Sequence, residues 1–180
     1  MSTTDKPLAV PRPGKVRVTS PAKMAKEAAR ARPKTRVIKV KAIEHGLVMQ
    51  VAGVRRYDHV TILGNIKKGL KSRSLSILEE GLDVSQKELS GLLAIPTSTL
   101  TRRRKQGRLK PEESDRVVRF ARLKDSAVQT MAGDKDAATQ WLNTPLEILG
   151  GETPLGHAST ELGARDVEDL LGRIRHGVFS

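Results

Sequence analysis

The spacing of apolar and polar positions between residues 85 and 107 predicts a helix-turn-helix. Ser85 and Glu88 have the S-x-x-E spacing of a capping box, in which each side chain accepts a hydrogen bond from the other residue's backbone, so a helix begins directly after Ser85. An i, i+3, i+4 stripe gives this helix one buried face. The stripe consists of Leu89, Leu92 and Leu93. Pro96 ends the helix, because the residue before a proline is pushed out of the α region.

A second helix follows, and its exposed side is predicted to be cationic. Thr97 or Ser98 caps it, Leu100 is buried, and Gly107 ends it. Its exposed residues are expected to be Thr101, Arg102, Arg103, Arg104 and Lys105. Arg103 stands where a helix-turn-helix usually has an apolar residue, so fewer residues than usual should pack this helix. An ordinary helical pair with a solvated basic face would give the same pattern, since helix pairs without a DNA function are common.

Two short amphipathic segments before this motif predict helices that pack on it and complete a small all-helical domain. They are residues 60–69 and 74–81, and each is closed by a glycine. The spacing of Gly64 and Gly69 is similar to that of a phosphate-binding loop. However, Leu70 stands where such a loop requires a lysine, so the helix is the better interpretation.

The helical pattern continues after the motif. Pro111 suits the first turn of a helix that keeps its period until Gly133, and Asp134, Thr144 and Thr153 each cap a further helix. The last helix carries an i, i+3, i+4, i+7 stripe. The stripe consists of Val167, Leu170, Leu171 and Ile174. The fold is therefore predicted to be all-α.

Two acidic residues and one tryptophan stand out within these helices. Glu113 and Asp115 lie in the first turn of the long helix, where they are placed to pair with Arg103 or Arg104 and orient them. Without the signal of a pocket, a structural salt bridge is a better interpretation than a catalytic carboxylate pair. Trp141, the only tryptophan, is predicted to anchor either the core or an interface.

The net charge of +13 is unevenly distributed along the chain. Residues 1–41 hold 12 Lys/Arg against 2 Asp/Glu, residues 102–124 hold 10 against 3, and residues 125–180 hold 4 against 9. A basic patch of this density can neutralise phosphates, whereas the acidic end implies a different partner. Because aromatic residues are only 2% of the chain, the composition argues against stacking on single strands, and duplex DNA is the expected nucleic acid.

The N-terminal part has too few large apolar residues to form a core. Residues 1–36 are therefore predicted to be a disordered basic arm that adds non-specific DNA affinity. Residues 37–57 form a connecting segment that is either a β-arm or a loose helix. The chain has no cysteine, signal peptide or apolar run long enough to span a membrane, so we expect a cytoplasmic protein without membrane contact.

Three runs and a set of spaced positions together carry a family resemblance. The runs are residues 98–104, 107–109 and 113–116. The spaced positions are Ala138, Trp141, Leu142, Pro145, Leu149, Gly150, Gly151, Thr153, Pro154, Leu155, Gly163, Ala164, Val167, Leu171, Arg173, Ile174 and residues 176–180. In these positions the chain resembles the Xre/MbcA/ParS-type antitoxins that pair with RES-domain toxins. The resemblance covers about residues 58–180, and His176 departs from it because a tyrosine is expected there.

This resemblance implies two domains with separate partners. Residues 58–124 would form an Xre-like helix-turn-helix domain that binds the duplex DNA of its own promoter as an autorepressor. Residues 125–180 would form a helical toxin-binding domain that covers the NAD pocket of a RES-domain toxin, which consumes NAD or ADP-ribosylates a target. The antitoxin itself would be no enzyme and would need no cofactor. We expect a homodimer within a toxin–antitoxin hetero-oligomer.

The predicted DNA contacts all lie on or just after the cationic helix. Bases in the major groove would be met by Thr97, Ser98, Thr101, Arg102 and Lys105. Phosphates would be met by Arg103, Arg104 and Arg108.

The predicted toxin contacts concentrate at the C-terminal end of the chain. Val178 and Phe179 dock either onto a partner or onto the protein's own core, because free termini are usually polar. Arg173 and Arg175 suit the negative end of the last helix and can meet toxin carboxylates. The complete predicted set is Trp141, Thr153, Pro154, Leu155, Arg173, Arg175, His176, Gly177, Val178, Phe179 and Ser180.

Two other functions remain open from the sequence. The first is a stand-alone transcription regulator whose C-terminal domain only dimerises. The second is an enzyme that uses histidines as acid–base groups. The four histidines are His45, His59, His157 and His176, and none has the spacing of a metal-ligand pair. No catalytic residue and no metal ligand is therefore assigned.

Overall fold

The computed structural model describes residues 46–177, and every regular element in this range is a helix. The helices are α2 (Gly46–Ala52), α3 (His59–Lys68), α4 (Arg73–Leu82), α5 (Gln86–Leu92), α6 (Thr97–Gln106), α7 (Pro111–Thr130), α8 (Lys135–Asn143), the 3-10 helix η1 (Glu147–Leu149), α9 (Pro154–His157) and α10 (Glu161–His176). The predicted all-α fold is confirmed for this range. The predicted disordered arm (1–36) and the residues Val178, Phe179 and Ser180 lie outside it.

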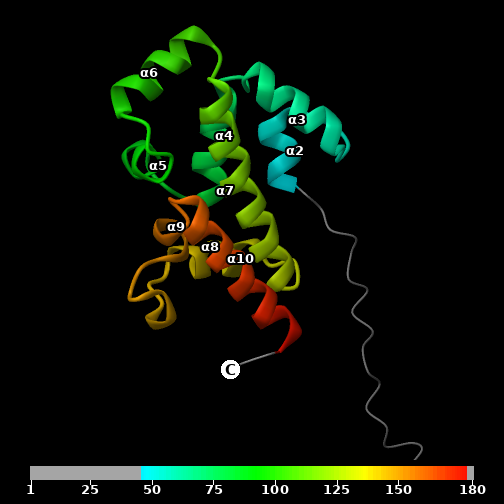
Figure 1. Cartoon of the computed structure of the whole chain (residues 1–180), viewed down its shortest axis with the longest axis vertical. Helices are drawn as coiled ribbons and strands as arrows, with labels where there is room; N and C mark the ends of the chain where they lie inside the picture. The colour runs from blue at the N-terminus through cyan, green and yellow to red at the C-terminus, as the bar shows by residue number, and fades with distance from the viewer. Residues whose placement is uncertain (1–45, 178–180) are drawn as a thin grey trace, which may run out of the picture. The chain divides into compact units, whose positions relative to one another are not determined.

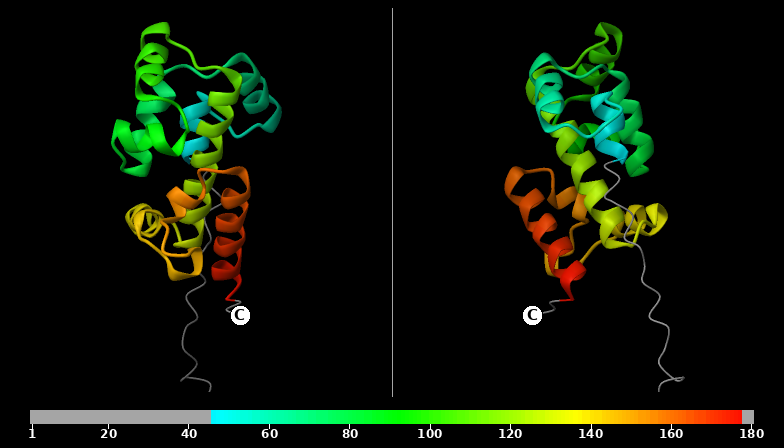
Figure 2. Two further views of the ribbon diagram at one scale, coloured as in Figure 1. Left: turned by 60° about the vertical axis from the view of Figure 1, so that its left-hand side comes forward. Right: turned by 90° about the vertical axis from the view of Figure 1, so that its right-hand side faces the viewer.

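The 20-residue helix α7 is the element on which most others pack. Helices α2, α3 and α4, which precede α7 in the chain, contact it, and so do α8 and α10, which follow it. Figures 1 and 2 show the earlier helices around the N-terminal half of α7 and the later ones around its C-terminal half. The predicted boundary between residues 124 and 125 falls inside this helix, and residues 46–177 cluster as one compact unit.

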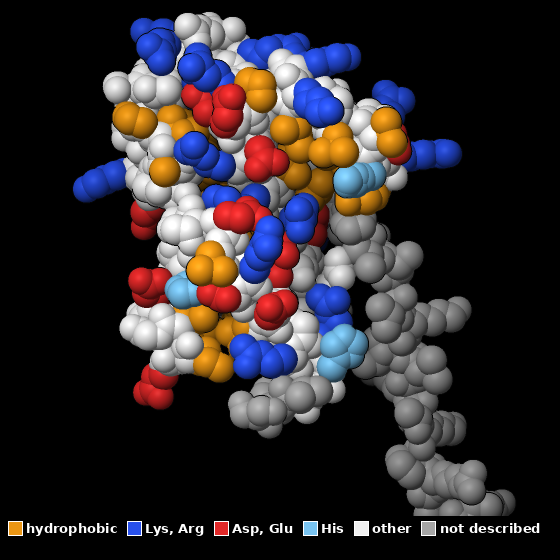
Figure 3. Space-filling model, in the orientation of Figure 1, with side chains coloured by type: hydrophobic (Ala, Val, Ile, Leu, Met, Phe, Trp, Pro, Cys, Tyr) orange, Lys and Arg blue, Asp and Glu red, His pale blue; other side chains and the backbone are white. Residues whose placement is uncertain are grey.

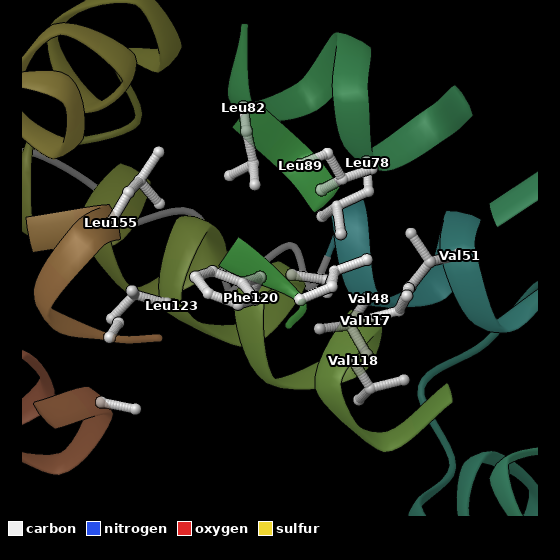
Figure 4. Packing of buried hydrophobic residues seen from close by; sticks show 14 of the residues in the cluster. Val48, Val51, Leu78, Leu82, Leu89, Val117, Val118, Phe120, Leu123 and Leu155 are labelled. Carbon is white, nitrogen blue, oxygen red and sulfur yellow. The ribbon is translucent and has the colours of Figure 1, made fainter. Parts of the chain in front are cut away.

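The core is a continuous cluster of apolar side chains along α7. Val117, Phe120 and Leu123 of α7 are almost completely buried. Figure 4 shows them at the centre of the cluster, with Val48 of α2 on one side and Leu155 of α9 on the other. Fully burying one such side chain contributes about 1.5–3 kcal/mol, so α7 accounts for a large share of the stabilising contacts.

The connecting segment that was predicted as a β-arm or a loose helix contains α2 between residues 46 and 52. The first backbone N–H groups of α2 have no acceptor within the helix. The carboxylate of Asp125 in α7 accepts hydrogen bonds from two of them. The backbone N–H groups of Leu47 and Val48 each donate to the Asp125 carboxylate at 3.0 Å. Residues 37–45, including the predicted strand pattern, lie outside the described range.

Several predicted helix ends were wrong. Helix α5 ends at Leu92, before Pro96 is reached, and α7 ends at Thr130, before Gly133. Thr97 and Ser98 do not cap α6, since the helix begins at Thr97 after Pro96 and has no side-chain cap. Gly81 does not close α4 but lies inside it, where it contacts Leu47, and the left-handed Asp83 follows the helix.

Thr144 does not start a helix either. It lies at the end of α8, where its hydroxyl donates to Gln140 O at 2.7 Å, and only the short η1 follows. The predicted caps at Asp134 and Thr153 are confirmed, as is the end of α6 at a left-handed Gly107.

Candidate nucleic-acid and partner interfaces

Helices α5 and α6 form the helix-turn-helix that the sequence predicted. The capping box is present: Ser85 N donates to Glu88 Oε2 at 2.7 Å, and Glu88 N donates to Ser85 Oγ at 3.3 Å. The turn between the helices contains Ala94 in a left-handed conformation (φ 48°). The Ser90 hydroxyl closes this turn by donating to Ile95 O at 2.7 Å. The direction of α6 is therefore fixed by the turn and by α5.

Arg103 was predicted to bind phosphate, but the structure buries its side chain. Only 8% of the residue is exposed, and its Nε donates to both carboxylate oxygens of Glu113, at 3.0 and 2.7 Å. Its Nη1 donates to Gln106 at 2.8 Å. The predicted pairing of Glu113 with an arginine of α6 is therefore confirmed. The exposure predicted for Arg103 is wrong, because this arginine fills the position where an apolar residue was expected.

The carboxylate of Glu113 holds a second partner, which fixes the start of α7. Lys110 N donates to Glu113 Oε2 at 2.7 Å. Burial by itself raises the pKa of this carboxyl, but the hydrogen bonds from Arg103 and from Lys110 N outweigh burial, so the pKa lies below its ordinary value. The charged pair thus joins the C-terminal half of α6 to the first turn of α7.

Arg104 is also held by an acidic side chain, but by one that the sequence did not suggest. Its Nη2 donates to both oxygens of Glu79 on α4 at 2.6 Å. The side chains are 35% and 17% exposed. Asp115, the other expected partner, is exposed. An arginine held in this way has fewer donors left for a phosphate.

The remaining predicted DNA contacts on α6 face solvent. They are Thr97, Ser98, Thr101, Arg102 and Lys105. The two cations among them, Arg102 and Lys105, form no ion pair within residues 46–177. Arg108 is exposed as well, although its Nη1 donates to Lys68 O at 3.1 Å and to Gly69 O at 3.0 Å. Arg102 and Lys105 are therefore the cations of α6 that are free to meet DNA.

The predicted contact residues of the C-terminal part divide into buried and exposed ones. Pro154 and Leu155 are buried, Leu155 as part of the core, and are not available to a partner in this structure. Thr153 caps α9 by accepting from Gly156 N at 3.0 Å, and Trp141 is half-buried against the core. Arg173, Arg175, His176 and Gly177 are exposed at the end of α10. Arg175 also donates to Ser126 and Thr130 of α7, at 3.2 and 3.3 Å.

A surface pocket of about 660 Å³ lies between η1 and α10. It is lined by Ile148, Leu149, His157, Asp166, Asp169 and Arg173. His157 joins its two sides, because Nδ1 lies 2.8 Å from Glu152 Oε2 and Nε2 lies 3.3 Å from Asp166 Oδ2. The hydrogen bond with Glu152, helped by Asp166, outweighs desolvation and holds the pKa of His157 above its ordinary value. Ile148 is 61% exposed, which adds an apolar side chain to this charged surface.

No group of three or more His, Asp or Glu side chains within residues 46–177 is placed to hold a metal ion. None of the helices in this part of the chain combines the length and the apolar composition that a membrane span requires.

Comparison with known proteins divides the described chain into two matched segments. Residues 62–122 match the Antitoxin Xre-like helix-turn-helix domain, and residues 127–177 match the Antitoxin Xre/MbcA/ParS C-terminal toxin-binding domain. An Antitoxin Xre from Yersinia enterocolitica is 40% identical over 120 residues, which cover 66% of this chain and 81% of that protein. The chain belongs to the Xre/MbcA/ParS antitoxin family.

Two further relatives of this antitoxin have informative names. An Antitoxin Xre from Photorhabdus laumondii is 47% identical over 75 residues, which cover 42% of this chain and 51% of that protein. A protein from a Sphingobium species named "Prs ADP-ribosylating antitoxin" is 30% identical over 134 residues, which cover 69% of this chain and 84% of that protein. The resemblance predicted from the sequence is confirmed, and the antitoxin carries a helix-turn-helix followed by a toxin-binding domain.

The antitoxin's sequence alone did not identify some residues that shape these surfaces. Glu79 lies 25 residues before Arg104, and no local pattern connects the two. His157 was considered only as a candidate acid–base group, whereas it links two segments of the toxin-binding domain. Ile148 follows a cap signal at Thr144 that proved misleading. The position of Arg103 at an apolar site, combined with the nearby Glu113, was the one signal that pointed to the buried pair.

Proposed function

We propose that this antitoxin binds the duplex DNA of its own promoter through α6 and represses its operon. The observation that supports the proposal is that only two of the four cations of α6 are engaged in ion pairs within the described part of the protein. Arg103 and Arg104 are held by Glu113 and Glu79, which fixes the helix, whereas Arg102 and Lys105 are exposed without an ion pair in the described range. Arg and Lys in such positions reach base edges and phosphates in a major groove.

The test is a gel-shift series with the full chain and a duplex of the DNA that precedes its gene. We expect Arg102→Ala with Lys105→Ala to lose about 1–3 kcal/mol of discrimination for each base contact removed. A double variant of Lys135 and Arg165 to Ala removes the same charge from exposed positions outside the helix-turn-helix and serves as the control. Equal promoter affinity of both double variants would overturn the role of α6 in DNA binding.

We further propose that the partner of the C-terminal domain is a RES-domain toxin and that the end of α10 covers its NAD pocket. The matched toxin-binding domain supports a toxin partner, and the name of the Sphingobium relative supports ADP-ribosylation as the chemistry to be blocked. The exposed residues at the end of α10 are Arg173, Arg175 and His176. In this proposal the antitoxin is no catalyst itself and acts as a homodimer within the complex.

Co-expression with the adjacent gene tests this second proposal. A chain that lacks residues 176–180 should remain folded but fail to protect cells from the toxin, because an apolar tip that enters a pocket excludes the substrate sterically. A control variant, Leu162→Ala, removes an exposed apolar side chain at the other end of α10. If the shortened chain is soluble and protects fully, inhibition by the tip is excluded. A failure to co-purify with any toxin would instead favour a stand-alone regulator.

A further inference from the structure

Four cations beside the end of α6 have no assigned role. They are Lys67 and Lys68 at the end of α3, Lys71 in the turn that follows, and Arg73 at the start of α4. All four are exposed, and none forms an ion pair within the described residues. We call these four residues the α3–α4 patch. Figure 3 shows Lys and Arg side chains along the upper edge of the molecule, where Figure 1 places α6 and α3.

The α3–α4 patch is fixed to the segment that follows α6. Lys71 and Arg108 form an isolated antiparallel bridge. The side chain of Arg108 crosses to the end of α3, where its Nη1 donates to Lys68 O at 3.1 Å and Gly69 O at 3.0 Å. These bonds engage the carbonyls that the end of a helix leaves without partners. The guanidinium therefore holds the turn together, while the lysine side chains remain free.

Two more contacts make this junction tight. Ser72 N donates to Gly107 O at 3.0 Å, so the residue that ends α6 is bonded to the backbone between Lys71 and Arg73 of the patch. At Gly69 (φ 81°), an added Cβ would lie 2.1 Å from the carbonyl oxygen of Leu109, which leaves no room for a side chain. Because backbone contacts join the two turns, the α3–α4 patch keeps a fixed position relative to α6.

This position suits the edge of a major groove. The ten residues of α6 extend roughly 15 Å, and a major groove is about 12 Å wide, so a helix lying across it delivers its end to the sugar-phosphate backbone. Lys and Arg at that edge can neutralise phosphates and release counterions, independently of base sequence. Within the described residues no acidic side chain pairs with the patch, and Glu79 of α4 is already occupied by Arg104.

We propose that the α3–α4 patch binds phosphates of the DNA strand that borders the groove occupied by α6. This inference rests on the proposed DNA binding by α6 and adds a second contact region to it. The patch would fix the register and angle of the antitoxin on the duplex, while α6 reads the bases. Its ligand is the phosphate backbone of duplex DNA, so its contribution is equal for operator and non-operator sequences.

The experiment measures affinity against salt concentration for Lys68→Gln with Lys71→Gln in the full chain. Two duplexes of equal length serve as probes, one from the DNA preceding the gene and one of random sequence. Each lost phosphate contact should reduce the slope of log affinity against log salt by about 0.9. The double variant should therefore lose nearly two units of slope on both probes, with the ratio of their affinities unchanged. Lys67→Gln with Arg73→Gln repeats the measurement independently.

The controls separate this inference from the proposed function. Lys135→Gln with Arg165→Gln removes equal charge elsewhere and should leave the slope nearly unchanged. If wild type binds, the Arg102 and Lys105 variant loses discrimination, and both patch variants keep the slope of the control, then only the patch is excluded. A change in the affinity ratio of the patch variants would also overturn it, because it would indicate base reading. If the wild type binds neither duplex, the proposed function fails and this inference fails with it.

Discussion

Helices α6 and α10 each present a surface to a proposed partner, but different interactions hold them in place. Helix α6 buries only Leu100 and Arg103, and it is oriented by the arginine pairs with Glu113 and Glu79. Helix α10 buries an apolar stripe against α7, and its ion pairs lie at the rim of that contact. Apolar packing tolerates small shifts, whereas a pair of charged groups joined by two hydrogen bonds specifies one geometry.

This difference follows from the charge that α6 must expose. A helix that is cationic on most of its surface has few positions left for apolar residues, so it cannot be oriented by a wide stripe. Burying one arginine against a carboxylate replaces the missing apolar contact. The number of cations on α6 therefore overstates how many contacts the helix can make in the proposed complex with DNA, because two of its arginines are engaged within the protein.

The largest expected effect comes from removing the acidic partner of α6. Glu113→Ala leaves Arg103 buried and unpaired, which should destabilise the protein by about 3–5 kcal/mol, measured as a lower midpoint in urea unfolding. Glu112→Ala changes the exposed neighbour in the same helical turn and should stay within about 0.5 kcal/mol. Equal midpoints for the two variants would mean that the pair does not orient α6.

The same pair predicts how acid affects the protein. Because the pKa of Glu113 is lower in the folded state than in the unfolded chain, its stabilising contribution is present above the ordinary value of 4.5. This contribution is lost as pH falls below 4.5 and through the lower folded pKa. The difference in stability between wild type and Glu113→Ala should therefore shrink on acidification, while Glu112→Ala should follow the wild type.

The corresponding change in α10 should be slightly smaller. Leu171→Ala removes a completely buried side chain and should destabilise the protein by about 2–5 kcal/mol. Since α7 passes through both matched segments, unfolding should remain a single transition observed at Trp141 and by circular dichroism. Two separate transitions would show that the helix-turn-helix and the toxin-binding domain unfold independently.

The local signals in the sequence predicted most of the helices but failed where an end depends on its surroundings. The tripeptide Thr-Pro-Leu occurs at residues 144–146 and 153–155 with the same expected cap. Thr153 does cap α9, whereas the hydroxyl of Thr144 is taken by Gln140 because α8 reaches Asn143. The same local sequence therefore gives two structures, and the preceding helix decides which one forms.

The candidate sites show a similar limit. The sequence correctly placed a cationic helix and a pairing between its arginines and Glu113, because these residues are close in the chain. It could not show that Glu79 would take Arg104, since the two residues meet only when α4 packs beside α6. The carboxylate of Asp125, which caps α2 across 77 residues, was missed for the same reason.

An ion pair at the rim of α10 should contribute much less than the buried pair of α6. Arg122 and Glu168 are 56% and 33% exposed, with 3.1 Å between Arg122 Nη2 and Glu168 Oε1. Solvent screens such a pair, so a double-mutant cycle with Arg122→Ala and Glu168→Ala should give a coupling of about 0–1 kcal/mol. The coupling should fall further in high salt. A coupling energy as large as that of a buried ion pair would mean that ion pairs hold α10 in place as strongly as they hold α6.

The smallest expected effect concerns His157, which joins the loop before α9 to α10 through Glu152 and Asp166. Hydrogen bonding to Glu152 raises its pKa, so the folded protein binds this proton more tightly than the unfolded chain does. The resulting stabilisation is complete below the ordinary value of 6.5 and is lost as pH rises through the higher folded pKa. Unfolding midpoints of wild type and His157→Gln should therefore differ at mildly acidic pH and converge in alkaline solution. In the Glu152→Gln background most of the difference should disappear at every pH, because the main partner has lost its charge. An equal difference between wild type and His157→Gln on both sides of neutrality would show that the imidazole acts through packing and not through its proton.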